Sequence, residues 1–182
     1  MIYIGIDYSM VSPSICVAMS ANGPYKISYL TDKRKFEMDW SPNSSIRIRG
    51  FRHDDWTHPI QRFQQLANWT MRRIPLGEKR VYMEDYAMGA KGQTFTIGEC
   101  GGILKREMWS NDIKYKLIAP TAVKKFATSK GTAKKDMMYE SWLKETGIDL
   151  LKGLDMKSCS SPLSDIVDSY FICRLAISKV DS

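Results

Sequence analysis

The sequence predicts one α/β or α+β domain built around a mixed β-sheet, and three observations support this expectation. The 182 residues are enough for a single domain with its own apolar core. The N-terminal part has the alternating apolar pattern of β-strands, and the remainder alternates between helix-like and strand-like segments. We therefore expect residues 1–182 to form a single domain.

Residues 1–30 predict three strands in succession. The first covers residues 2–6, where isoleucine occupies every second position, and it leads directly into Asp7. The second covers residues 14–19. The third covers residues 25–30 and follows the turn sequence Asn-Gly-Pro at 22–24. The expected unit is a β-meander with an acid at the end of its first strand.

Residues from about 31 to 58 lack a clear periodicity. This segment is rich in arginine and tryptophan and is interrupted by proline and serine: Trp40, Arg47, Arg49, Arg52 and Trp56 all lie in it. We expect an irregular insertion here, with at most a short hairpin around 45–51.

After residue 58 the chain alternates between helical periodicity and short apolar runs. Helices are expected at 59–74, at 94–109, from Pro120 onward, at 133–146 and at 162–179, and strands at 80–85 and 114–118. A glycine-rich connection at 87–93 joins the strand at 80–85 to the helix at 94–109.

The composition indicates an intracellular protein with a polyanionic partner. The chain has 27 Lys+Arg against 20 Asp+Glu, a net charge of +7, which favours nucleic acid first and an anionic membrane second. The four cysteines form no CxxC pair, so we expect free thiols in the cytoplasm instead of disulfides or a zinc site. No secretory leader is expected, and no apolar run reaches the about 18 residues of a membrane span.

Four carboxylates have a placement that suits a metal site: Asp7, Glu84, Asp165 and Asp168. Phosphodiester cleavage is favoured by two divalent ions about 3.5–4 Å apart, and Mg²⁺ prefers oxygen ligands. Asp7 and Glu84 end predicted strands, whereas the other two are one turn apart on the last predicted helix. Each acid also has an ordinary explanation, as a solvated strand end or a partner of the helix dipole. Periodicity does not separate Glu84 from Asp85.

Five lysines with no acid among them lie between residues 124 and 135, namely Lys124, Lys125, Lys130, Lys134 and Lys135. Such a run is usually a solvated helix face. Here it surrounds a Ser-Lys-Gly-Thr loop before a helix, where backbone N–H groups and lysines together suit a phosphate.

Four segments in order resemble the RuvC family of Holliday junction resolvases, in the RNase H-like superfamily: IGIDYS, VYMEDYAMG…TFTIGECGGILKREM, LIAPTAVKKFATSKGTAKKDMM and SPLSDIVDSYFICRLA. The resemblance implies an RNase H-like α/β fold, a five-stranded mixed sheet flanked by helices. It implies a Mg²⁺-dependent endodeoxyribonuclease with two metal ions, replaceable by Mn²⁺. The ligands and catalytic residues would be Asp7, Glu84, Asp165 and Asp168, so the family pattern selects Glu84 over Asp85.

The resemblance also implies partners. These are branched DNA, chiefly the four-way junction, and a second copy of the chain, with the helix at 94–109 as the dimer interface. The lysine run would contact DNA, with Lys124 and Lys135 nearest the cleaved phosphate. The aromatic that stacks on bases in the family falls on Ala87, so Tyr86 beside it becomes the candidate for that contact.

Two departures from the family pattern stand out. Asp-Pro-Gly after the first strand is replaced by Asp7-Tyr8-Ser9, and the insertion at about 31–58 is longer than the bacterial pattern. The insertion could add DNA contacts or act as a covering flap. Such divergence suggests a phage-encoded member, acting in the host cytoplasm with looser sequence preference.

Three other functions fit parts of the pattern. One is an RNase H-like nuclease that acts on RNA–DNA hybrids or flaps, and another is a non-catalytic module for structured nucleic acid. The presence of all four acids argues against the second. An actin-like or sugar-kinase ATPase would need glycine-rich phosphate loops after Asp7 and a much longer chain, and neither is present.

Overall fold

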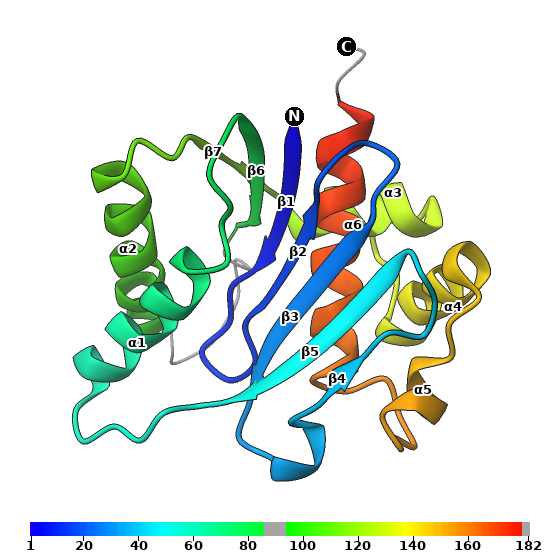
Figure 1. The fold of residues 1–182 in the computed structure, drawn as a ribbon, viewed down its shortest axis with the longest axis horizontal. Coiled ribbons are helices and arrows are strands. Elements are labelled where there is room, and N and C mark those ends of the chain that lie inside the picture. The colour runs from blue at the N-terminus through cyan, green and yellow to red at the C-terminus, as the bar shows by residue number, and fades with distance from the viewer. Residues whose placement is uncertain (86–93, 180–182) are drawn as a thin grey trace.

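A computed structural model describes residues 1–85 and 94–179. Within these residues one mixed sheet has seven strands in the order β4-β5-β3-β2-β1-β6-β7 (Figure 1). The strands are β1 (Ile2–Asp7), β2 (Ser14–Ala18), β3 (Tyr25–Thr31), β4 (Asp39–Trp40), β5 (Ile46–Arg52), β6 (Lys79–Glu84) and β7 (Tyr115–Ile118). Strands β1 and β6 are parallel, as are β6 and β7, whereas β2 is antiparallel to both β1 and β3.

The expectation of a five-stranded sheet was therefore too small, because the sheet of the described residues has seven strands. The five expected strands are present as β1, β2, β3, β6 and β7. The other two come from the segment expected to be an irregular insertion: β5 pairs in parallel with β3, and β4 pairs antiparallel with β5. Ile46 and Ile48 of β5 are buried, whereas the arginines between and after them are exposed. This period-two alternation is what makes the segment a strand.

Helices cover both faces of the sheet. One face packs on α1 (Pro59–Met71) and α2 (Thr94–Ser110), and its core includes the isoleucines of β1. The other face packs on α3 (Pro120–Thr128), α4 (Lys135–Thr146), α5 (Leu150–Gly153) and α6 (Leu163–Ser178). A short 3-10 helix, η1 (Arg34–Phe36), precedes β4. The helices expected at 59–74, 94–109, 133–146 and 162–179 are confirmed to within a few residues, whereas α5 was not predicted.

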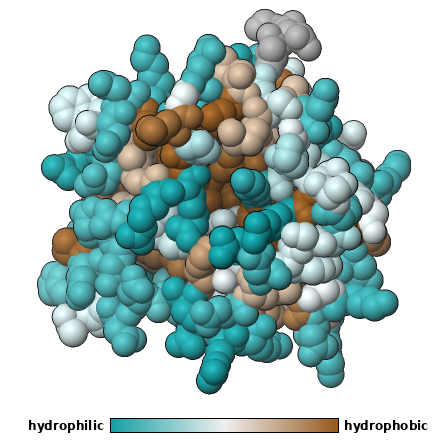
Figure 2. All heavy atoms as spheres, viewed as in Figure 1, coloured by the Kyte–Doolittle hydropathy of each residue, from teal (hydrophilic) through white to brown (hydrophobic). Residues whose placement is uncertain are grey.

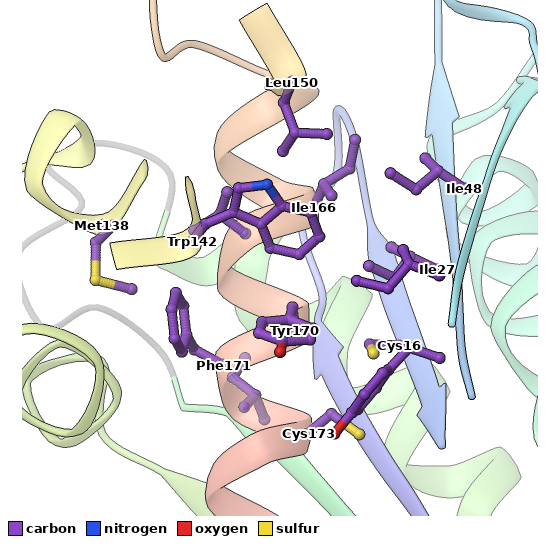
Figure 3. Close-up of a cluster of buried hydrophobic side chains, with 14 of the residues drawn as sticks. Cys16, Ile27, Ile48, Met138, Trp142, Leu150, Ile166, Tyr170, Phe171 and Cys173 are labelled. Carbon is purple, nitrogen blue, oxygen red and sulfur yellow. The ribbon is translucent and has the colours of Figure 1, made fainter. Parts of the chain in front are cut away.

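The last helix, α6, lies against the middle of the sheet and is almost entirely buried. Figure 3 shows its aromatic residues Tyr170 and Phe171 beside Trp142 of α4, with the ring centroids of Trp142 and Tyr170 4.8 Å apart in an edge-to-face arrangement. Gly5 of β1 lets the backbone of α6 approach the strand closely, because a Cβ atom at Gly5 would overlap the backbone of Ser169 and Cys173. The sheet and the middle of α6 are therefore held close together.

The cysteines match the expectation of free thiols: Cys16, Cys100 and Cys173 are buried and Cys159 is partly buried. Across residues 1–85 and 94–179, no helix combines the length and the apolar character needed to cross a bilayer.

Candidate active site

Asp7 and Glu84 are brought to the same edge of the sheet by the parallel pairing of β1 with β6. Ile6 is in register with Met83, so Asp7 and Glu84 are the next residues along the two strands. Ile6 and Met83 both belong to the core under α1 and α2. Because side chains alternate along a strand, Asp7 and Glu84 project to the opposite face, which is the face covered by α6.

The same alternation separates Glu84 from its neighbour Asp85. Tyr82, two residues before Glu84, belongs to the core that contains α6, and Glu84 projects to that side and is partly buried. Asp85 is exposed, and its backbone N–H donates to the carbonyl oxygen of Ile118 in β7 at 2.9 Å. The structure therefore brings Glu84 toward the start of α6.

The start of α6 supplies Asp165 and Asp168, one helical turn apart. Asp165 lies in the first turn and is 8% exposed. Its Oδ1 accepts a hydrogen bond from Ser164 at 3.3 Å, and the hydroxyl groups of Ser161 and Ser12 lie near enough to lower the pKa of its carboxyl group. Its Oδ2 is buried and has no hydrogen-bond partner. An unpaired buried carboxylate oxygen is costly, and binding a cation is one way to remove that cost.

A buried hydroxyl pair fixes α6 relative to the strand that flanks Asp7. Ser14 of β2 is the register partner of Asp7, and its Oγ lies 2.8 Å from Oγ of Ser169. Ser169 directly follows Asp168 in α6. This bond connects elements far apart in sequence and holds Asp168 beside the end of β1.

The four acids lie close enough together for their charges to act on one another. Burial, followed by the negative charges of Asp165, Glu84 and Asp168, raises the pKa of Asp7 well above its usual value. Lys135 opposes this rise. We refer to these four acids below as the carboxylate cluster.

The same effects act on the other members of the carboxylate cluster. Burial and the charge of Asp168 raise the pKa of Glu84 to about 7, and burial and the charge of Asp165 raise the pKa of Asp168 to about 7. Burial also raises the pKa of Asp165, against the opposing effects of nearby serine hydroxyls and of Lys135. Buried carboxylates with raised pKa values, gathered at one point, are typical of functional sites.

The ligand chemistry of the cluster suits Mg²⁺, because it consists of carboxylate oxygens, including the unpaired oxygen of Asp165. As the side chains stand, however, no three His, Cys, Asp or Glu residues of the described ranges are close enough together to hold a metal ion. The electrostatic coupling acts over a longer range than metal ligation does. The four residues are therefore of the type that Mg²⁺ binds. Their side chains would have to move closer together to coordinate an ion.

Of the five candidate lysines, the structure brings Lys124 and Lys135 toward the carboxylate cluster. Lys124 of α3 lowers the pKa of Glu84 and of Asp168 against their larger upward shifts. Lys135, the first residue of α4, donates from Nζ to Oγ of Ser164 at 3.2 Å. The other three, Lys125, Lys130 and Lys134, are exposed on the same segment. Tyr86, the candidate stacking residue, lies outside the described residues.

Beside the cluster is a cavity of about 300 Å³, of which Asp7 and Glu84 form part of the wall. Tyr8, Met10 and Cys100 are among its other lining residues. Sequence reasoning missed the serines around Asp165. Ser164 is adjacent to Asp165 and could have been suspected, whereas only the fold brings Ser12 near Asp165.

No protein-family model matches the sequence, and no curated protein sequence matches it. Among solved structures, RuvC of Thermus thermophilus is similar with a TM-score of 0.54 and 15% identity, over 94% of this chain and 92% of that chain. RuvC of the same organism in complex with a Holliday junction substrate is similar with a TM-score of 0.54 and 13% identity, over 97% of each chain. The yeast mitochondrial Holliday junction resolvase gives a TM-score of 0.42 and 14% identity, over 97% of this chain and 80% of that chain. The chain therefore has an α/β fold, with a mixed sheet and flanking helices, that matches RuvC structures.

Proposed function

We propose that this protein is a metal-dependent endonuclease that resolves four-way DNA junctions, and acts on related branched DNA, by phosphodiester hydrolysis. The observation that carries the proposal is the placement of four carboxylates, with Asp7 and Glu84 at the ends of the paired strands β1 and β6 and Asp165 and Asp168 in the first turns of α6. The similarity in fold to RuvC, including RuvC in complex with a Holliday junction substrate, supports the choice of substrate.

The proposed metal ligands are Asp7, Glu84, Asp165 and Asp168, with two Mg²⁺ ions, replaceable by Mn²⁺, as the cofactor. When bound, the ions would supply an activated water and stabilise the leaving oxygen. Ser164, which donates to Oδ1 of Asp165, would keep this carboxylate oriented. Lys124 and Lys135 would neutralise part of the charge on the substrate phosphate, since both act on the cluster from α3 and α4.

The lysine run between 124 and 135 would contribute affinity without sequence choice, because contacts to phosphates position DNA and do not read bases. Lys125, Lys130 and Lys134 are exposed on the same segment as the two lysines at the cluster. We expect DNA binding to weaken when any of the five lysines is neutralised. Tyr86 is retained as a proposed stacking residue.

A homodimer is part of the proposal, because paired cuts on a nearly two-fold symmetric junction need two sites. The helix α2 carries an exposed stripe that suits a helix–helix interface. Phe95 is 90% exposed and Trp109 is 79% exposed. Between them, a Cβ at Gly98 or Gly102 would meet nothing within 4 Å. The departures at Asp7-Tyr8-Ser9 and in the 31–58 segment support a phage-encoded protein that acts in the host cytoplasm, and this origin stays a proposal.

The test is Asp7→Asn, assayed with four-way junctions, flaps and RNA–DNA hybrids in the presence and absence of Mg²⁺. We expect the wild type to make paired, Mg²⁺-dependent nicks in the junction, and the variant to bind it without cutting. Cleavage confined to RNA–DNA hybrids would replace junction resolution with an RNase H-like activity. Binding by the wild type with no cleavage under any metal would favour a non-catalytic binding module.

A further inference from the structure

A second cavity, of about 180 Å³, lies between the end of β5 and helix α1, outside the carboxylate cluster. Arg52 and His53 line it from the end of β5, and Trp69, Arg72 and Arg73 line it from the end of α1 and the turn that follows. We call it the arginine cavity. It is smaller than the about 300–1,000 Å³ of a typical small-molecule site, which suits a single phosphate group better than a whole nucleotide.

Arg73 is held rigidly at this cavity by two aromatic rings. Its guanidinium carbon lies 4.0 Å from the ring centroid of Trp69 and 4.2 Å from that of Phe51, and its Nη1 donates to the carbonyl oxygen of Trp69 at 2.8 Å. Stacking of this kind orients the planar guanidinium for binding to phosphate oxygens. Its Nε is buried without a hydrogen-bond partner.

The charges that shift the pKa of Arg73 are of its own sign. Burial, followed by the positive charges of Arg72 and Arg49, lowers the pKa of Arg73 to about 10. Asp54 is an acid among the cavity's described lining residues, and it is exposed. Gathering like charges is unfavourable, and an anion bound among them would remove the penalty.

The strand directions place the arginine cavity at the same sheet edge as the carboxylate cluster. β1 is antiparallel to β2, β2 is antiparallel to β3, and β3 is parallel to β5, so β1 and β5 end at the same edge. Figure 1 shows the chain leaving β5 at this edge and running to α1.

The loop after Asp7 connects the two places. His53 Nε2 lies 2.8 Å from the carbonyl oxygen of Val11, and Arg62 Nη2 donates to the carbonyl oxygen of Met10 at 2.6 Å. Figure 2 shows the face that carries α1 and β5, where hydrophilic residues cover most of the lower half. The loop that follows Asp7 is therefore hydrogen-bonded to His53 of the arginine cavity and to α1.

We propose that the arginine cavity binds a backbone phosphate of a DNA arm that extends away from the carboxylate cluster, with Arg52, Arg72 and Arg73 as the binding residues. This inference rests on the proposed action on branched DNA. It gives the 31–58 segment a specific role, because β5 supplies one wall of the cavity. Contacts of this kind should be independent of DNA sequence and sensitive to salt.

The test compares two double variants in an Asp7→Asn background, which allows binding to be measured with Mg²⁺ present. Arg52→Gln/Arg72→Gln removes two exposed charges from the arginine cavity. Lys144→Gln/Lys152→Gln removes two exposed charges from α4 and α5, which Figure 1 shows on the opposite side of the molecule from α1. Each is titrated with long-armed and short-armed four-way junctions at several salt concentrations, and melting temperatures check the fold.

We expect the arginine variant to bind long-armed junctions roughly tenfold more weakly. The slope of its log binding constant against log salt concentration should correspond to about one to two fewer phosphate contacts. The lysine variant should bind like its parent, and short-armed junctions should not distinguish the variants. Asp54→Asn, which removes the acid at the cavity, should bind long arms roughly two- to threefold more tightly.

Equal weakening in both double variants, or unchanged binding in the arginine variant, would overturn the inference. These results can be separated from failure of the proposed function. If the wild type neither binds nor cleaves branched DNA, both proposals fall. If it cleaves junctions while Arg52→Gln/Arg72→Gln has no effect on long-arm binding, only the inference falls.

Discussion

Lys135 at the start of α4 donates from Nζ to Oγ of Ser164 at the start of α6, over 3.2 Å. Ser164 in turn donates to Oδ1 of Asp165. This chain of two hydrogen bonds connects the lysine-rich segment to the carboxylate cluster, and Lys135 lowers the pKa of Asp7 and of Asp168 against their larger upward shifts. The lysine is thus placed both to contact a phosphate and to favour the ionised acids.

Lys135→Gln should lower the rate of junction cleavage by about 10- to 100-fold at neutral pH. It should also shift the rising limb of the pH–rate profile to higher pH, because the carboxylates lose a nearby positive charge and must be deprotonated to bind metal. Single-turnover cleavage across pH measures both effects. Lys135→Arg should restore the wild-type pH–rate profile. Lys134→Gln should weaken DNA binding without shifting the pH–rate profile. A Lys135→Gln profile of unchanged shape would contradict this role.

Asp7→Asn should stabilise the protein in the absence of divalent metal. The substitution removes a buried negative charge that the other acids of the carboxylate cluster repel. We expect the melting temperature in EDTA to rise by about 2–4 °C, roughly 1 kcal/mol for a chain of this size. Asp55→Asn is the matched control, since Asp55 is exposed and lies outside the carboxylate cluster, and it should change the melting temperature little. A lower melting temperature for Asp7→Asn would indicate that the carboxylate has a structural role.

Part of the carboxylate cluster was predictable from the sequence, and the limits have physical causes. Asp7 follows a strand with isoleucine at every second position, so its place at a strand end was clear. Glu84 and Asp85 were not separable by pattern, because Val81, Tyr82 and Met83 are apolar on both faces of β6. Only the position of α6 over one face shows which acid points toward Asp165.

The contribution of residues 31–58 to the sheet illustrates another limit. Residues 46–49 alternate between buried isoleucine and exposed arginine, but Gly50 cuts this alternation short, so the local pattern is brief. Their partner is β3, and the parallel pairing of Tyr25 with Ile46 joins residues far apart in sequence. The approach of Ser12 to Asp165 depends on the fold in the same way. Contacts of this kind form only when the sheet is assembled, so no local sequence pattern predicts them.

The metal-free protein should become less stable as the pH rises from about 5 to about 8. In the folded state the pKa values of Glu84 and Asp168 are about 7, against usual values of 4.5 and 3.8. Between these values the folded protein holds protons that the unfolded chain has released, so raising the pH favours unfolding. Thermal melts in EDTA should show a fall on the order of 5 °C.

Two comparisons make this pH prediction specific. Glu84→Gln/Asp168→Asn should flatten the pH dependence, because the groups that take up protons on folding are gone. Mg²⁺ added at pH 8 should raise the melting temperature of the wild type and leave that of the double variant almost unchanged. Stability that rises with pH in EDTA, or an equal response to Mg²⁺ in both proteins, would contradict the assignment of these acids.

The exposed stripe of α2 should hold the proposed dimer together. Gly98→Arg places a long charged side chain where a Cβ currently meets nothing within 4 Å, so the folded monomer should tolerate it. In a dimer the same side chain would separate the two helices, and light scattering should report a monomer. Leu76→Asp is the matched control, because Leu76 is 94% exposed but lies outside α2.

With the dimer lost, cleavage should change from paired cuts to single nicks at each junction, since each monomer carries one carboxylate cluster. A Gly98→Arg protein that stays dimeric would place the interface elsewhere on the surface.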